Sequence, residues 1–241
     1  MNRKVFIAGA SGAIGRRLCR LLVDEGWSVT GTTRSLNKAP MLRDLGVEPV
    51  VVDVFDATLL LDVVGKAQPE IVVHQLTDLP SALDPAKMAE ALVQTARLRE
   101  IGTRNLVAAA VAADVKRMVA QSLAFAYAPG PTPYREEAPL MQDENARALA
   151  SLEQQVLAAP LTGIVLRYGR LYGPGTGFDS PASGGPLHVD DAADAARGAL
   201  TRGQAGIYNI AEDDRTVSIK KAADALGWVP GFRLGGEHKS L

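Results

Sequence analysis

VFIAGASGAIGRRL, from Val5 to Leu18, places three glycines between a short apolar run and a stretch with helical spacing. Glycine loses more backbone freedom on folding than any other residue, so Gly9, Gly12 and Gly15 in one turn indicate a backbone with a special task. A GxxGxxG turn between a first strand and a first helix predicts a dinucleotide site. The start of the helix offers free N–H groups and a positive dipole end to a pyrophosphate. The plainer alternative is an ordinary strand-to-helix turn with incidental glycines.

Short apolar runs alternate with helical patterns along the rest of the chain. The runs are apolar throughout rather than at alternate residues, which is typical of a parallel sheet covered by helices on both faces. Right-handed crossovers then predict an α/β fold with a doubly wound parallel sheet, Rossmann-like, of about seven strands. We expect strands at Lys4–Ala8, Trp27–Thr32, Val47–Val52, Glu70–His74, Lys116–Ala120, Gly163–Arg167 and Gly206–Ile210. We expect helices at Ile14–Glu25, Leu36–Leu45, Ala57–Gly65, Asp84–Ala113, Glu144–Ala158, Asp190–Leu200 and Ser218–Leu226.

Two stretches interrupt this alternation. Ala128–Gln142 is rich in proline and Gly173–Pro186 is rich in glycine and proline, so both are predicted to be loops. We expect one Rossmann-like domain over residues 1–241. Within it, residues 1–160 would form the dinucleotide-binding core and residues 161–241 a reduced C-terminal substrate lobe.

Composition and charge exclude several classes of protein. The chain has 241 residues, of which 47% are hydrophobic and 22% charged, as is usual for a globular protein. Its 26 basic and 27 acidic residues form no long basic run, so we expect no nucleic-acid partner. No apolar run approaches the roughly 20 residues that span a bilayer, so we expect no membrane partner. A single cysteine excludes an intramolecular disulfide and a cysteine-based metal cluster, and we expect no metal. With no charged-then-apolar leader, the expected location is the cytoplasm.

The end of the second predicted strand bears on the choice of dinucleotide. Val29–Ser35 reads VTGTTRS and offers no carboxylate to accept hydrogen bonds from the ribose hydroxyls of NAD. Arg34 stands there instead, and a guanidinium suits a 2′-phosphate. We therefore predict NADP, with NAD possible. The alternative is that Arg34 is a solvated surface residue.

Seven segments in chain order resemble the extended short-chain dehydrogenase/reductase family, the NAD(P)-dependent epimerase/dehydratase group. Together they cover nearly the whole chain and are far more specific than any one of them. They are Gly9–Gly15, Asp53-Val54, Val72–Leu76, Gly102–Leu106, Lys116–Val119 with Ser122 and Tyr127, Leu166–Gly175, and His188–Asp191 with Tyr208–Ile210.

The resemblance implies a bound nicotinamide dinucleotide and a small-molecule substrate. It also implies a homodimer as a possibility, formed through Asp84–Ala113 and Glu144–Ala158. The residues expected to contact the cofactor are Gly9, Ser11, Gly12, Ala13, Ile14, Gly15, Arg34, Asp53, Val54, Gln75, Leu76 and Thr77.

The proton-transfer pair of that family is missing. The family places Tyr-x-x-x-Lys on the helix after the fifth strand, where the lysine lowers the pKa of the tyrosine. In this chain the two positions fall on Asn145 and Leu149, and no Tyr-x-x-x-Lys occurs anywhere in the sequence. In the long helix, Arg99 replaces the usual asparagine three residues before Gly-Thr.

Other side chains could act on a substrate instead. We name Ser122, Tyr127 and Tyr168 as candidate catalytic residues, because all three lie at the ends of the fifth and sixth predicted strands. For Tyr127 the alternative is packing beneath the proline-rich loop. Arg99 and Arg170 either bind an anionic substrate or are solvated surface residues.

Three functions follow from these residues. The first is an NADP-dependent oxidoreductase of the epimerase/dehydratase type, acting on a small carbonyl or hydroxyl substrate with a non-standard proton donor. The second is a dinucleotide-binding sensor or regulatory protein without turnover. The third is an isomerase or another non-redox enzyme of the same fold.

Overall fold

The computed structural model describes residues 3–80 and 83–235 of the chain. Seven strands form one sheet in the order β3-β2-β1-β4-β5-β6-β9, and every neighbouring pair is parallel. They are β1 (Lys4–Ala8), β2 (Ser28–Thr33), β3 (Glu48–Val51), β4 (Ile71–His74), β5 (Arg117–Leu123), β6 (Thr162–Tyr168) and β9 (Gly206–Ile210). The predicted α/β fold with a doubly wound parallel sheet is confirmed.

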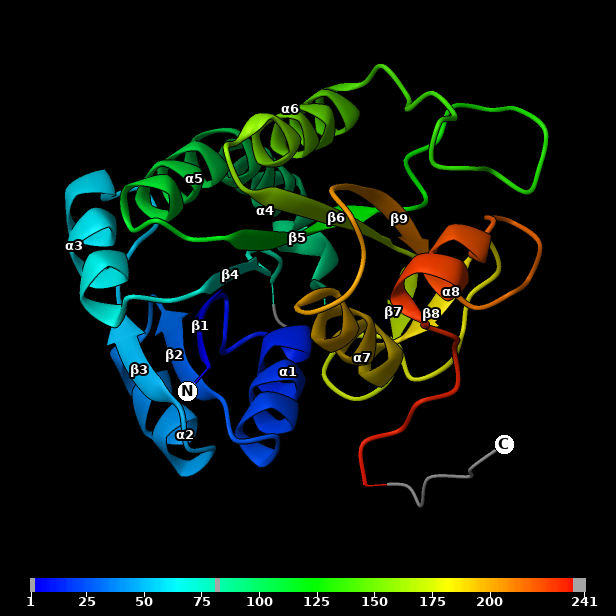
Figure 1. Ribbon diagram of the computed structural model, residues 1–241. Helices are drawn as coiled ribbons and strands as arrows, with labels where there is room; N and C mark the ends of the chain where they lie inside the picture. The colour runs from blue at the N-terminus through cyan, green and yellow to red at the C-terminus, as the bar shows by residue number, and fades with distance from the viewer. Residues whose placement is uncertain (1–2, 81–82, 236–241) are drawn as a thin grey trace.

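Helices cover both faces of this sheet (Figure 1). They are α1 (Ala13–Asp24), α2 (Ala39–Asp44), α3 (Ala57–Ala67), α4 (Pro85–Arg97), α5 (Thr103–Ala112), α6 (Glu144–Ala158), α7 (Val189–Ala199) and α8 (Lys220–Leu226). The apolar sides of α1 and α7 close one core, and those of α3, α5 and α6 close the other. The strands are apolar on both sides because each side faces one of these cores.

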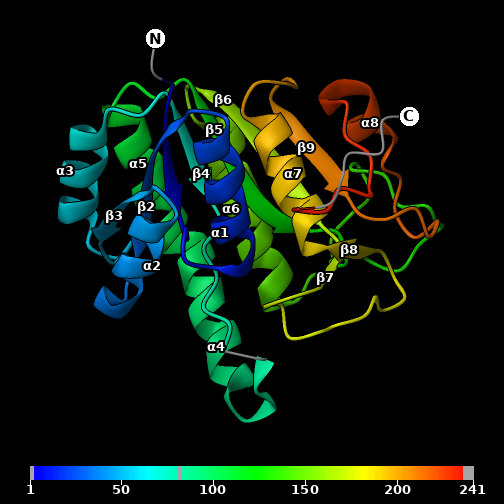
Figure 2. The same cartoon turned by 90° about the horizontal axis from the view of Figure 1, so that it is seen from below.

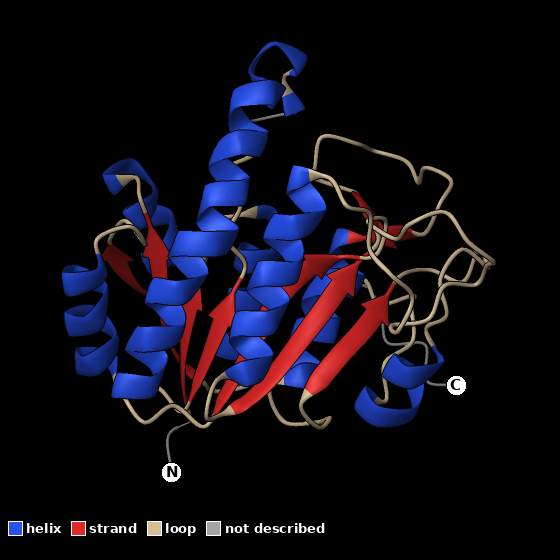
Figure 3. Ribbon diagram, turned by 90° about the horizontal axis from the view of Figure 1, so that it is seen from above, coloured by secondary structure: helices blue, strands red, loops and turns tan. Residues whose placement is uncertain are grey.

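The chain reverses its direction of winding between β1 and β4, which lie side by side in the centre of the sheet. In such sheets ligands bind outside the carboxyl ends of the strands, at this reversal. Figure 3 shows the strand arrows pointing toward the edge where α4 extends beyond the sheet, and Figure 2 shows the same projection of α4 from the opposite side. The loops after β1, β2 and β4 therefore form the expected site.

Two predicted helices are divided in the structure. The helix predicted at Asp84–Ala113 consists of α4, a π-helical turn at Leu98–Gly102 (η3) and α5. Apolar periodicity does not reveal such a turn, which widens the helix locally without changing the residue types. The helix predicted at Leu36–Leu45 is a 3₁₀ turn, η1 (Leu36–Lys38), followed by α2, because Pro40 occupies a helix-start position.

The C-terminal part adds a second, two-stranded parallel sheet, β7 (Arg170–Tyr172) and β8 (Pro186–His188), that was not predicted. Strands this short carry too few residues for a periodic signal. The proline-rich stretch Ala128–Gln142 is a loop, as predicted, and single bridges join Tyr127 to Leu140 and Tyr134 to Val217. Because β6 and β9 also belong to the large sheet, the part of the chain from β6 to α8 shares its core. The division at residue 160 and the homodimer stay predictions.

Within the described ranges, none of the helices has the length and apolar character that crossing a bilayer requires.

Candidate functional site

The glycine turn between β1 and α1 is packed so closely that side chains do not fit. Gly9 has a φ of +92°, and a Cβ there would lie 2.6 Å from the carbonyl oxygen of Gln75. A Cβ on Gly15 would lie 2.2 Å from the carbonyl oxygen of Gly9. Backbone atoms cannot give way as a flexible side chain can, so both positions require glycine.

The start of α1 is open toward the carboxyl edge of the sheet. Gly12 occupies the position before the helix, no side chain caps it, and no acidic residue stands in the first turn. The first N–H groups of a helix have no partner within it, so Ala13, Ile14 and Gly15 offer donors to an anion. This cradle, which a Cβ would fill, fits the pyrophosphate of a dinucleotide.

Two threonines at the end of β2 hold this turn in place. The Gly9 amide donates to Thr32 Oγ1 at 3.2 Å, and the Ser11 hydroxyl donates to Thr33 Oγ1 at 3.3 Å. Neither threonine was predicted. The available signal was that two consecutive residues at the end of a buried strand are both polar and β-branched. Neighbouring side chains of a strand point to opposite faces of the sheet, so both faces have a polar group at this strand end.

Arg34 lies at the edge of the sheet, beside two carboxylates. Its guanidinium forms an ion pair with Asp78, in the loop after β4, and its side chain is half exposed. The hydrogen bond to Asp78 raises the pKa of Arg34, and the charges of Asp78 and Asp53 add to this. The sequence expectation placed Arg34 beside a 2′-phosphate, but Asp78 was not foreseen as its partner.

The predicted pair Asp53-Val54 follows β3 next to this ion pair. Asp53 Oδ1 accepts a hydrogen bond from the Phe55 amide at 3.0 Å, which fixes the turn after β3. The carbonyl oxygen of Val54 accepts from Asn105 Nδ2 at 3.0 Å, and its side chain is buried. Asn105, which lies on α5, therefore fixes the position of this turn.

At the carboxyl ends of β4 and β6, Gln75 and Tyr168 form a buried pair. Gln75 Nε2 donates to the Tyr168 hydroxyl at 3.1 Å. Gln75 Oε1 is buried and has no partner among the described residues. Burial raises the pKa of Tyr168, so its phenol stays protonated at neutral pH. An unpaired buried acceptor at this point fits a ligand that carries N–H or O–H donors.

His74 ends β4 as a neutral, structural residue. Its Nε2 lies 3.0 Å from Thr103 Oγ1, and its Nδ1 accepts a hydrogen bond from the Leu76 amide at 3.3 Å. Burial, followed by the positive charge of Arg99, lowers the pKa of His74 to about 4. The ring thus fixes the start of the segment that contains Leu76 and Thr77.

The other two candidate catalytic residues, Ser122 and Tyr127, belong to a buried network. The Ser122 hydroxyl donates to Glu153 Oε1 at 2.6 Å, and the Tyr127 hydroxyl donates to Asn209 Oδ1 at 2.6 Å. Between them, Arg167 donates to both carboxylate oxygens of Glu153, at 2.8 and 2.7 Å, and to the Tyr127 hydroxyl at 3.0 Å. The structure therefore ties both hydroxyls to neighbouring side chains, separately from the pair formed by Gln75 and Tyr168.

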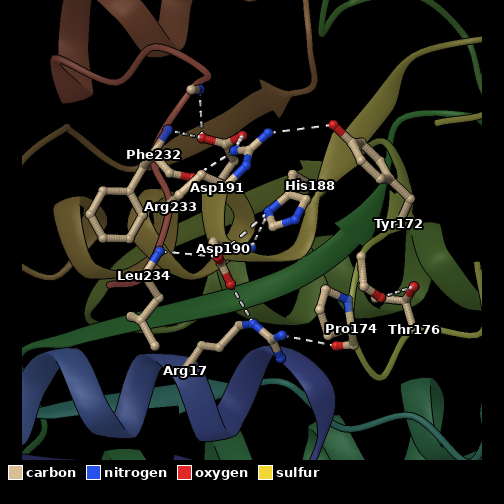
Figure 4. A network of polar contacts seen from close by, with 12 residues as sticks. Arg17, Tyr172, Pro174, Thr176, His188, Asp190, Asp191, Phe232, Arg233 and Leu234 are labelled. Carbon is tan, nitrogen blue, oxygen red and sulfur yellow. Dashed lines mark hydrogen bonds and ion pairs between the residues drawn. The ribbon is translucent and has the colours of Figure 1, made fainter. Parts of the chain in front are cut away.

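A further polar network joins the start of α7 to α1, to the loop after β7 and to the stretch 231–234 (Figure 4). Arg17, on α1, donates to Asp190 at 2.5 Å and to the carbonyl oxygen of Pro174 at 2.9 Å. Asp191 Oδ1 accepts from the amides of Gly231 and Phe232, both at 2.7 Å. These bonds hold the loop after β7 and the stretch 231–234 close to the start of α7.

On α6, the two positions that the resemblance assigns to proton transfer carry no titratable group. Asn145 stands in the first turn, and Leu149 is 1% exposed within the apolar core. At these two positions the helix therefore carries an amide side chain and a buried apolar side chain.

Comparison with known proteins identifies relatives at two levels of similarity. Residues 5–183 match the model of the NAD dependent epimerase/dehydratase family. The chain is 40% identical to a 3-diazoavenalumate denitrifying reductase from Streptomyces sp., over 95% of this chain and 80% of that protein. It is 31% identical to a ceramide reductase from Caulobacter vibrioides. That match covers 71% of this chain and 47% of the ceramide reductase.

Solved structures share the fold at lower identity. The crystal structure of a UDP-glucose 4-epimerase from Thermotoga maritima, with UDP-glucose, superposes with a TM-score of 0.78 at 18% identity. The superposition covers 94% of this chain and 93% of the epimerase. At this level of identity the similarity describes the arrangement of strands and helices.

Proposed function

Because the chain belongs to the NAD dependent epimerase/dehydratase family, we propose that it is an NAD(P)H-dependent reductase that removes the nitrogen of a diazo or diazonium compound. The name of its 40% identical relative describes a reductive removal of nitrogen from a diazo compound. The similarity extends over nearly all of this chain and most of that protein, and this supports a reaction of the same kind.

The observation that carries this proposal is the missing proton donor. A carbonyl becomes an alcohol only when hydride addition is accompanied by a proton, which the tyrosine of the family supplies. Here α6 has Asn145 and Leu149 at the two positions, and Leu149 is fully packed in the core. A helix without the tyrosine and the lysine of the family suits a hydride acceptor that needs no proton from the protein.

A diazonium carbon is such an acceptor. When bound, the reduced nicotinamide would supply a hydride that forms a new C–H bond. The C–N bond breaks, its electron pair leaves with N₂, and the ring recovers its aromatic electrons. The nicotinamide is oxidised and the carbon is reduced. For a diazonium ion the hydride alone completes the balance, with no proton and no further reductant, whereas a neutral diazo compound would first take up one proton from solvent to become the diazonium ion.

The residues of this chain would bind and orient the reactants. The cradle of Gly9, Gly12 and Gly15 at the start of α1 fits the pyrophosphate. Arg34 would face the adenosine ribose, and we keep NADP as the preferred cofactor with NAD as the alternative. The unpaired Gln75 Oε1 would accept a hydrogen bond from the nicotinamide end of the cofactor or from the substrate. Contacts of Asp53, Val54, Leu76 and Thr77 with the cofactor stay predictions.

For the three candidate catalytic residues we propose positioning roles. Ser122 and Tyr127 donate to Glu153 and Asn209, so their hydroxyls hold the ends of β5 and the proline-rich loop. Tyr168 orients Gln75, and its raised pKa keeps it from acting as a base at neutral pH. A non-standard proton donor is not required if the substrate consumes no proton.

Isotope transfer tests this proposal. The purified protein is mixed with NADPH deuterated at C4 and a diazotised aminobenzoate, and the product is analysed by mass spectrometry. We expect N₂ release and one deuterium on the ring carbon that carried the nitrogen, at a rate above that of the same mixture without protein. A parallel panel of aldehydes and ketones should show little consumption of NADPH.

Two results would contradict the proposal. Reduction of carbonyls without any diazo reaction would return the chain to the ordinary chemistry of its family. Binding of NADPH with no reaction on either panel would favour the sensor without turnover.

A further inference from the structure

Arg99 is a buried cation for which the described part of the chain provides no hydrogen-bond or ion-pair partner. The residue is 7% exposed. Burial lowers the pKa of its guanidinium to about 10, so the group still carries its charge at neutral pH. The guanidinium is mostly buried and lacks a counter-ion, which weakens the folded state, while its nitrogen atoms are not among the fully enclosed ones and stay open to a ligand. An anionic ligand that binds there would remove this cost.

The neighbours of Arg99 along the chain show where it lies. Thr95, four residues earlier, accepts a hydrogen bond from the Asp78 amide at 3.1 Å. Thr103, four residues later, contacts His74 at 3.0 Å. Thr95 and Thr103, on either side of the π-helical turn, both contact the segment from His74 to Asp78, and Arg99 stands between them in the chain. The effect of its charge on the pKa of His74 agrees with this placement.

The π-helical turn Leu98–Gly102 brings Arg99 to this position. Such turns are rare, and they occur frequently at functional sites because they displace side chains from the regular helical pattern. The turn also packs against α6, where Gln155 Nε2 donates to the carbonyl oxygen of Glu100 at 3.2 Å. The helix with Leu149 in place of a lysine therefore lies next to a turn that carries its own buried cation.

We propose that Arg99 binds the carboxylate of an aromatic acid substrate and holds it at the carboxyl end of β4. A guanidinium binds a carboxylate through two parallel, charge-assisted hydrogen bonds, and these are strongest where water is excluded. The name of the 40% identical relative denotes the anion of an acid that carries a diazo group. This inference rests on the proposed reductase function and names its substrate class.

Binding experiments test the role of Arg99 separately from turnover. The probes are benzoate, 4-hydroxycinnamate and 5-phenylpentadienoate, each compared with its methyl ester by calorimetry in the presence of saturating NADP⁺. We expect the wild-type protein to bind at least one acid at least tenfold more tightly than its ester. Arg99→Gln should reduce this preference to less than threefold, and Arg99→Lys should retain part of it. Arg104→Gln, at an exposed position on α5, is the matched control and should keep the wild-type preference.

Two further measurements separate a substrate site from a cofactor site and from a structural role. The Kd for NADP⁺ alone should change less than twofold in Arg99→Gln, since the anion bound is that of the substrate. Arg99→Met should raise the Tm of the ligand-free protein by about 2–4 °C, because an unpaired buried charge is removed.

The proposal is overturned if the wild-type protein does not distinguish acids from esters, or if Arg99→Gln keeps the preference. A large loss of NADP⁺ affinity in Arg99→Gln would overturn it in favour of a cofactor phosphate. A third outcome is acid binding that depends on Arg99 without any transfer of deuterium to a diazo carbon. That outcome would reject the proposed function but support the carboxylate site.

Discussion

At the scale of single residues, we expect the choice between NADP and NAD to depend on how Arg34 is shared between Asp78 and a ligand. The Arg34–Asp78 pair is partly exposed, so its contribution to stability is small and its guanidinium can be drawn away by a phosphate. Asp78 would at the same time accept hydrogen bonds from an unphosphorylated ribose. One ion pair can therefore favour either cofactor.

Removal of each partner should change cofactor preference in opposite directions. We expect Arg34→Ala to lower the affinity for NADPH about tenfold relative to NADH, as the loss of a charge-assisted hydrogen bond predicts. We expect Asp78→Asn to raise the preference for NADPH, because the guanidinium loses its internal competitor. Fluorescence titration with both cofactors measures this, with Arg20→Ala on the exposed side of α1 as the control. If the ratio of NADPH affinity to NADH affinity is the same in both variants as in the wild type, the 2′-phosphate role of Arg34 is refuted.

At the scale of elements, the unit formed by β1, the glycine turn and α1 is the proposed anion cradle. Gly15 lies in the first turn of α1, directly over the carbonyl oxygen of Gly9. The helix can approach the turn only because Gly15 has no Cβ. The N–H groups at the start of α1 owe their position to this contact.

Gly15→Ala should therefore damage cofactor binding far more than an ordinary helix substitution. A Cβ at 2.2 Å from a backbone oxygen forces the turn to move, and we expect the NADPH affinity to fall at least tenfold. Gly65→Ala in α3 is the matched control, because a Cβ there meets nothing within 4 Å. That control should keep its affinity and gain about 0.5–1 kcal/mol in unfolding free energy. Similar affinities in the two variants would exclude the glycine cradle as the pyrophosphate site.

At the scale of the whole molecule, the pair formed by Glu153 and Arg167 joins α6 to β6 and the proline-rich loop. Their side chains are 6% and 4% exposed, and Arg167 also donates to the carbonyl oxygen of Glu136 at 3.0 Å. Ser122 and Tyr127 complete this network. A buried pair of this kind is costly to break, because the remaining charge stays buried.

Glu153→Gln should destabilise the fold by about 3–5 kcal/mol, since Arg167 then lacks a carboxylate in the interior. In a chain of this size that loss corresponds to a Tm lower by roughly 10 °C. Asp224→Asn breaks the exposed pair with Lys220 and should change stability by less than about 1 kcal/mol. Thermal unfolding of both variants measures the difference, and equal Tm values would show that the network does not hold the molecule together.

The sequence by itself determined the class of fold and the absence of a Tyr-x-x-x-Lys pair, and it predicted where a dinucleotide would bind. Apolar runs, helical spacing and glycine positions are properties of contiguous residues, and they determine the local conformation of the backbone. The ends of most elements lie within one or two residues of their predicted bounds for this reason.

Only the tertiary structure decided which side chains meet. It paired Arg34 with Asp78 and Glu153 with Arg167, and it placed the π-helical turn at Leu98–Gly102. It also buried Arg99 without a partner among residues 3–80 and 83–235. Such pairings join residues that are far apart in the chain, and they depend on which elements stack and at what register. No local pattern encodes that stacking, because it results from the packing of the whole core.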